Sequence, residues 1–174
     1  MKLTAQEEYG LRCLLVLARG PEKFLSIEEV AGREGLTHAY VAKLMRALRR
    51  AGLVTSVLGK HGGYRLARAA EDTPLDAVIG GLGGRLFSSN FCQQHSGQSH
   101  VCIHDGDCSI RPFLIGLDAV IQRALGQVTL RDLVSTEHGM GSWVEAHLGA
   151  GGSTVGSGST VAESSRLTLR RVPS

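Results

Sequence analysis

The sequence of 174 residues contains no apolar run that approaches the roughly 18 consecutive residues of a membrane-spanning helix. Its first ten residues, MKLTAQEEYG, lack the basic start and the apolar stretch of a secretory signal peptide. We therefore expect a cytoplasmic protein with no membrane partner. Hydrophobic residues make up 43% and charged residues 20%, close to the globular average, which excludes a fully disordered or collagen-like chain.

Recognised catalytic motifs are also missing. The sequence has no phosphate-binding glycine loop of known spacing, no nucleophile elbow, and no pair of carboxylates on a predicted rigid element. Asp105 and Asp107 lie close together, but they fall in a glycine-containing loop, where aspartates usually form turns. The sequence therefore predicts a protein that is not an enzyme.

Acidic residues are absent from the interval between Leu36 and Arg68, although the whole chain has a net charge of only +3. An excess of one charge in a balanced chain costs self-repulsion, and a polyanionic partner such as double-stranded DNA is the usual reason for it. The alternative is a solvated basic face without a partner. The seven basic residues of the interval are Lys43, Arg46, Arg49, Arg50, Lys60, Arg65 and Arg68.

Three helix starts are marked by capping residues. Thr4 followed by Glu7, and Ser26 followed by Glu29, have the spacing of a capping box, in which each side chain binds the backbone N–H of the other residue. Thr37 is a third N-cap candidate. The predicted helices cover residues 5–19, a short stretch that ends at Gly35, and residues 38–51.

The order of the elements predicts a winged helix-turn-helix. The second and third helices are joined by a tight glycine-containing turn, which is typical of a helix-turn-helix. The β-prone runs LVTSVL and YRLAR follow, separated by glycines that permit a hairpin turn. A short helix then begins with Pro74 at its first position. The fold class is mainly α with a small β-hairpin wing, and this domain spans residues 1–82.

The third helix is the candidate recognition helix, because the second helix of a helix-turn-helix enters the major groove of DNA. The hairpin would lie against the neighbouring minor groove. A winged helix that binds proteins instead is the alternative. The candidate DNA-binding residues are Thr37, His38, Tyr40, Lys43 and Arg46 in the helix, and Lys60 and His61 in the hairpin.

The chain has four cysteines, of which Cys13 falls on the apolar stripe of the first helix and is predicted to be buried. Cys92, Cys102 and Cys108 lie in an irregular segment, residues 83–111. An odd number of thiols in a reducing compartment argues against a structural disulfide and favours a metal. Thiolates suit zinc or an iron–sulfur cluster, and both usually take four ligands. The candidates for the fourth ligand are His95, His100, His104, Asp105, Asp107, Glu7 and Glu8.

Two further segments complete the chain. Residues 112–135 begin with a helix that is apolar on more than one face, which predicts that it packs against its own copy in a homodimer. They end in a turn or short helix over residues 129–134. Residues 149–174 are rich in glycine and serine and are predicted to be a disordered tail.

These motifs together resemble the IscR/NsrR/RirA family of bacterial winged-helix transcription regulators. The resemblance covers about residues 1–135. It rests on the opening MKLT, the helix-turn-helix VAGREGLTHAYVAKLMRALRRAGLV, the hairpin SVLGKHGGYRLAR, the three-cysteine segment and the closing VTLRDLV. It implies a dimeric DNA-binding protein, which we expect to be a repressor. Its iron–sulfur cluster would sense nitric oxide, redox state, or the supply of iron or clusters.

The resemblance also implies the ligands of that cluster. Cys92, Cys102 and Cys108 match the three cluster cysteines, and Glu8 matches a carboxylate ligand that some members supply from the other subunit. Arg111 stands where IscR-like members have a histidine ligand, which strengthens the case for Glu8. A 4Fe–4S cluster is favoured over a 2Fe–2S cluster. The alternative is a regulator switched by bound zinc or by a disulfide between Cys102 and Cys108, without a cluster.

Overall fold

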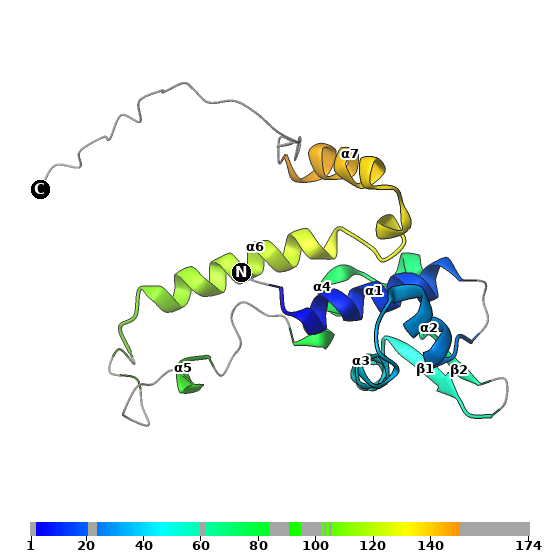
Figure 1. The fold of residues 1–174 in the computed structure, drawn as a ribbon. Coiled ribbons are helices and arrows are strands. Elements are labelled where there is room, and N and C mark those ends of the chain that lie inside the picture. The colour runs from blue at the N-terminus through cyan, green and yellow to red at the C-terminus, as the bar shows by residue number, and fades with distance from the viewer. Residues whose placement is uncertain are drawn as a thin grey trace, which may run out of the picture.

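The computed structural model describes residues 3–20, 24–59, 62–83, 91–94, 102, 104 and 106–149. Figure 1 shows helices, then a two-stranded hairpin, then further helices, so the predicted mainly helical fold with a β-hairpin wing is confirmed. The elements are α1 Ala5–Arg19, α2 Ile27–Glu34, α3 His38–Arg50, β1 Val54–Val57, β2 Gly63–Leu66, the 3-10 helix η1 Ala70–Asp72, α4 Leu75–Leu82, α5 Phe91–Gln94, α6 Ile110–Gly126, the 3-10 helix η2 Asp132–Val134 and α7 Glu137–Leu148.

The predicted capping boxes form at the starts of α1 and α2. The Thr4 hydroxyl accepts a hydrogen bond from the Glu7 N–H at 3.3 Å, and the Glu7 carboxylate accepts one from the Thr4 N–H at 2.7 Å. Ser26 and Glu29 make the same pair of bonds at 3.1 and 2.8 Å. Gly35 then ends α2 in the left-handed conformation, with φ of 65°. The N–H groups of Gly35 and Leu36 donate to the Ala31 carbonyl, which closes the turn between α2 and α3.

β1 and β2 form the antiparallel wing, in which Val54 lies opposite Leu66. Near the tip, Gly59 has φ of 120°, and its carbonyl accepts a hydrogen bond from the Gly62 N–H at 2.9 Å. A Cβ atom at position 62 would collide with the backbone carbonyl of Val57. The tip therefore requires glycine, in agreement with the predicted hairpin.

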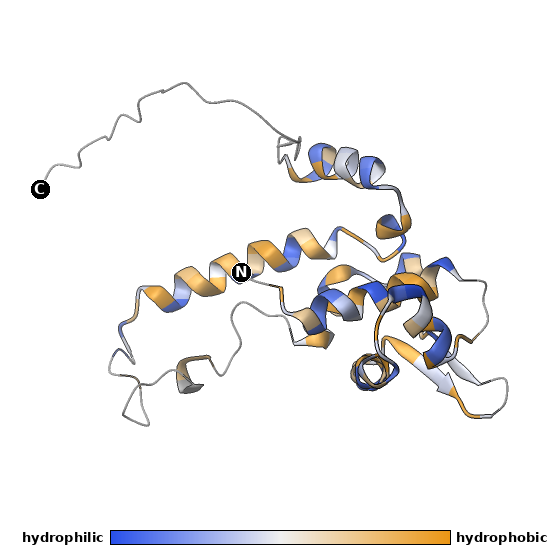
Figure 2. Cartoon of the chain, viewed as in Figure 1, coloured by the Kyte–Doolittle hydropathy of each residue, from blue (hydrophilic) through white to orange (hydrophobic). Residues whose placement is uncertain are grey.

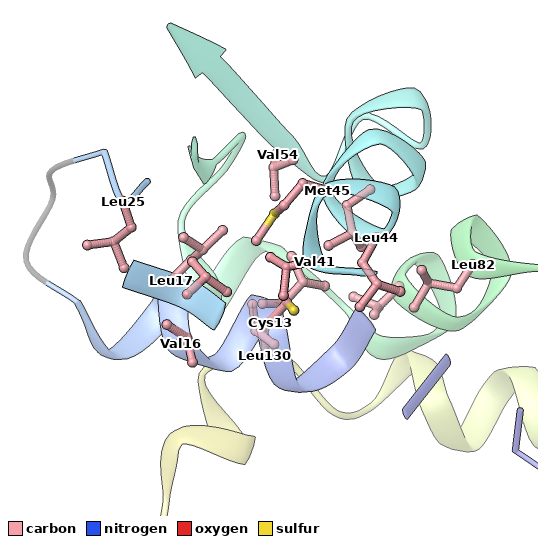
Figure 3. Packing of buried hydrophobic residues seen from close by; sticks show 14 of the residues in the cluster. Cys13, Val16, Leu17, Leu25, Val41, Leu44, Met45, Val54, Leu82 and Leu130 are labelled. Carbon is pink, nitrogen blue, oxygen red and sulfur yellow. The ribbon is translucent and has the colours of Figure 1, made fainter. Parts of the chain in front are cut away.

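A single hydrophobic core joins the helix-turn-helix, the wing and the segment after α6. Figure 3 shows side chains from α1, α3, β1 and α4 meeting in it, together with Leu130. The N–H of Leu130 donates to the Thr73 carbonyl at 2.8 Å, which fixes the end of α6 to the winged-helix unit. The largest fully buried side chains are Leu14, Leu25, Leu44, Met45, Leu48 and Leu130.

α4 begins one residue later than the sequence predicts. Pro74 is its N-cap, with extended backbone angles (φ −74°, ψ 150°), and Leu75 is the first helical residue. Proline fits either position because both leave its missing N–H without cost. The N–H of Leu75 donates to the Val128 carbonyl at 2.8 Å, a second bond between the winged-helix unit and the end of α6.

α6 extends the predicted helix by a few residues, and Figure 1 shows it reaching beyond the helices of the core. Figure 2 colours most of its length as hydrophobic. Despite this character, no helix in the described part of the chain is long and apolar enough to cross a membrane.

The sequence predicts a final turn or short helix over residues 129–134, where the structure has η2, but it does not predict α7. The Thr136 hydroxyl caps it by accepting a hydrogen bond from the Gly139 N–H at 3.1 Å, and Gly149 ends it with φ of 60°. Glycine within the helix lowers its propensity, and Met140 and Trp143 pack against the core without forming a long apolar stripe. The threonine and the terminal glycine are the signals that could have indicated it.

The domain boundaries at residues 82, 111 and 135 stay predictions. Residues 150–174 of the predicted tail lie outside the described residues.

Candidate functional site

The outward face of α3 is a cationic surface. Lys43 and Arg46 are exposed and lie three residues apart, so they share one side of the helix. Arg50 is also exposed and lies four residues beyond Arg46 on that side. Among the described residues, no carboxylate pairs with these three side chains. The opposite face is buried through Val41, Leu44, Met45 and Leu48.

The first turn of α3 combines capping, exposure and packing. The Thr37 hydroxyl accepts a hydrogen bond from the Tyr40 N–H at 3.3 Å, and His38 is exposed. The Tyr40 ring is half-buried and meets the ring of Tyr9 on α1 edge to face, with centroids 5.8 Å apart. Tyr40, predicted as a DNA contact, therefore also fixes the start of α3 against α1.

The wing lies beside the recognition helix, because α3 packs against β1. Its strands end at a tip where Leu58 is almost fully exposed. Lys60 and His61, the predicted wing contacts, lie outside the described residues, so their role stays a prediction. Together, the exposed face of α3 and the wing form the arrangement that places a helix in the major groove of DNA and a hairpin beside it.

The three cysteines of the predicted metal site lie between α4 and α6. Cys92 is in the short helix α5, while Cys102 and Cys108 precede α6, and all three are half-buried free thiols. Among the described residues, no three His, Cys, Asp or Glu side chains converge at metal-binding distances. The structure thus does not bring the three thiols into one ligand set. In kind and in accessibility, they are nevertheless the soft donors that zinc and iron–sulfur clusters take.

Cys13 is different in kind from these three thiols. Its side chain is completely buried in the core, and the loss of solvent raises its pKa to about 12. Since metal binding requires the thiolate, Cys13 stays protonated and inert near neutral pH. This agrees with its prediction as a core residue.

The two adjacent glutamates of α1 have different surroundings. Glu7 is buried and held by the Thr4 capping box, so it is not free to bind a metal. Glu8 is exposed on 60% of its side chain, and its nearest cationic partner, Arg12, lies 3.9 Å away. Arg12 makes its shorter bond, of 2.6 Å, to Glu34. Of the two, only Glu8 has a carboxylate that is free to bind a metal.

The other candidates for a fourth ligand lie in the cysteine segment. His104 is exposed, and its carbonyl accepts a hydrogen bond from the N–H of Asp107, which is also exposed. His95, His100 and Asp105 lie outside the described residues.

Comparison with known proteins identifies relatives over most of the chain. Residues 3–136 match the Rrf2 family, which is described as an iron-dependent transcriptional regulator. The protein rrf2 of Nitratidesulfovibrio vulgaris (strain Hildenborough) is 49% identical over 135 residues, which cover 77% of this chain and 87% of that protein. The HTH-type transcriptional regulator NsrR of Halalkalibacterium halodurans is 32% identical over 138 residues, covering 79% and 92%.

Solved structures give the same result. The global cysteine regulator CymR of B. subtilis superimposes with a TM-score of 0.59 at 26% identity, over 77% of this chain and 96% of its own. These matches agree with the resemblance to the IscR/NsrR/RirA family, and they indicate no family of enzymes.

The cationic face of α3 leads to a test by substitution. We expect Lys43→Ala to weaken binding to a DNA duplex, selected from a random pool by the wild-type protein, by about tenfold, because a base contact contributes about 1–3 kcal/mol. Arg123→Ala, which removes an exposed charge from α6, is the matched control and should leave the affinity unchanged. Fluorescence anisotropy at several salt concentrations measures both variants. An unchanged affinity of Lys43→Ala throughout the salt series would remove this residue from the interface.

Proposed function

Because the chain belongs to the Rrf2 family of transcriptional regulators, we propose that it is a cytoplasmic DNA-binding repressor whose affinity for promoters is controlled by an iron–sulfur cluster. The observation that carries this proposal is the pairing of two features. An unpaired cationic face on α3 is suited to DNA, and three accessible thiols in one segment are suited to a metal. The proposal includes no catalytic activity.

The cluster would be held by Cys92, Cys102 and Cys108, with Glu8 of the second subunit as the fourth ligand. A carboxylate is a weaker ligand than a thiolate, so this position is the one most easily exchanged. The cluster supplies a centre that responds to nitric oxide, redox state or iron supply. We favour a 4Fe–4S over a 2Fe–2S cluster.

The homodimer would form through α6. Ile110, Phe113, Leu117 and Val120 are exposed and recur at intervals of three and four residues, which is the spacing of a coiled-coil seam. α6 also packs against α4. A second copy of the same helix covers such a seam with matching side chains, so self-association explains why a helix this apolar stands open to solvent.

The dimer would also explain how a change at the metal ligands alters DNA binding. Glu8 is followed directly by Tyr9, whose ring contacts Tyr40 at the start of α3. A change in what holds Glu8 would shift the first turns of α1, and this packing would pass the shift to the recognition helix. Since two recognition helices must match half-sites about one DNA turn apart, a small shift in the dimer changes the affinity.

A second candidate function is a regulator without a cluster, switched by zinc or by a disulfide between Cys102 and Cys108. The relative that favours it is CymR, which is named as a cysteine regulator. Visible absorption separates the two candidates, because zinc and disulfides are colourless.

The cluster ligands are tested with protein purified without oxygen, by visible absorption with iron and acid-labile sulfide content. We expect a brown protein whose absorption disappears in Cys92→Ala, because a thiolate ligand is lost, and persists in the matched control Cys13→Ala, because that thiol is buried in the core. Glu8→Gln should keep the fold but change the spectrum or speed the loss of the cluster.

Far-UV circular dichroism confirms that each variant is folded. A colourless wild-type protein, with stoichiometric zinc or without metal, would overturn the cluster proposal. An unchanged Glu8→Gln spectrum would move the fourth ligand to a histidine such as His104.

The dimer is tested by placing a charge on the seam. Phe113 is exposed on 68% of its surface, and Phe113→Asp should convert a dimeric protein to a monomer, because the aspartate would be buried unpaired between two helices. Leu58→Asp, at the wing tip, is the matched control and should stay dimeric. Sedimentation equilibrium measures the mass. A wild-type monomer at all concentrations, or a Phe113→Asp dimer, would exclude this interface.

A further inference from the structure

A groove of about 440 Å³ lies at the base of the wing, at the opposite end of β2 from the hairpin tip. Arg65 at the end of β2, Arg68 just beyond it, and Arg131 just before η2 all line this arginine groove. Its apolar lining includes Leu17 from α1 and Ala70 from η1, both of which are buried. The groove therefore combines a cationic rim with an apolar floor.

The arginines of the groove have few partners within the chain. In the described part of the protein, the side chains of Arg68 and Arg131 make no ion pair or side-chain hydrogen bond, and Arg65 stacks over the Phe24 ring at 4.9 Å. Glu71 is the one carboxylate that lines the groove, so the lining has three positive charges and one negative. The guanidinium donors are available to a ligand from outside.

No residue of α3 lines the groove, so the groove is separate from the cationic surface described above. α3 packs against β1, whereas α1, which lines the groove, packs against β2. The lining of the groove thus includes neither Lys43 nor Arg46. Its volume is in the range of about 300–1,000 Å³ that is usual for small-molecule sites. A small ligand fits these observations better than the DNA backbone does.

We propose that the arginine groove binds a small organic anion that carries carboxylate or phosphate groups. Guanidinium groups bind both kinds of group through paired N–H donors, and such charge-assisted bonds are the stronger class of hydrogen bond. The apolar floor accommodates the carbon skeleton, which distinguishes the expected ligand from an inorganic ion. This site is independent of the cysteine segment and does not rest on the proposed cluster.

The position of the groove also gives the ligand a structural effect. Arg68 follows the wing, whereas Arg131 belongs to the segment after α6, and this segment is already tied to η1 by the hydrogen bond from the Arg131 N–H to the Ala70 carbonyl at 3.2 Å. An anion held by both guanidinium groups would add a further link between the winged-helix unit and the segment after α6. Binding would therefore stabilise the docking of the α6 end on the winged-helix unit.

The test uses the full-length protein with two probes, succinate for carboxylates and glycerol 3-phosphate for phosphate esters. Each is compared with potassium chloride at the same ionic strength, and thermal unfolding and isothermal titration calorimetry measure the binding. We expect one probe to raise the unfolding temperature in a saturable way, because a ligand that binds only the folded state stabilises it. Arg68→Ala and Arg131→Ala should each weaken its binding about tenfold or more.

Arg33→Ala removes an exposed arginine of α2 outside the groove and is the matched control, which should bind the probe like the wild type. The proposal is overturned if neither probe acts beyond potassium chloride, or if Arg33→Ala weakens binding as much as the groove variants do, since diffuse charge would then explain it. It is also overturned if Arg68→Ala and Arg131→Ala lower DNA affinity while leaving the probes unaffected, because these arginines would then serve the DNA backbone.

Discussion

The burial of one face of α3 is the constraint on which the rest of the molecule depends. Leu44 and Leu48 lie in the core, and burying a leucine side chain contributes about 1.5–3 kcal/mol. Since one side of the helix must face inward, Lys43 and Arg46 necessarily face outward as one surface. The same burial holds β1 against α3, which sets where the wing stands beside that surface. DNA recognition therefore follows from core packing.

In the proposed mechanism, α1 links the exposed face of α3 to the cysteine segment. Its inner face places Cys13 in the core as an inert thiol, and its first turn places Glu8 in solvent close to Tyr9, which packs on Tyr40. The two halves of the proposed mechanism thus share one rigid helix. In the proposed mechanism α6 joins them to a second copy of the chain. The hydrogen bonds from the Leu75 N–H to the Val128 carbonyl and from the Leu130 N–H to the Thr73 carbonyl tie the end of α6 to the winged-helix unit.

The sequence was sufficient to predict the elements whose structure is decided by interactions between residues close together in the chain. The Thr4 and Ser26 capping boxes and the glycines of the hairpin each act within a few residues, so they were readable directly. α7 could not be predicted in this way, because glycine weakens its helical pattern and because the helix is held by packing against the core. The double role of Tyr40 depends on Tyr9, which is distant in sequence, and the arginine groove likewise joins residues from three separate elements. How the three cysteines gather stays a prediction.

The most direct test of the central claim is whether the state of the cysteine segment changes DNA affinity. Protein purified without oxygen, with its iron and sulfide measured, is titrated against the selected duplex, and the same sample is titrated again after a chelator has removed the iron. We predict affinities that differ by about tenfold or more, which is within the usual range of coupling between two sites. Equal affinities before and after the removal of a measured cluster would contradict the claim that DNA binding is controlled by it.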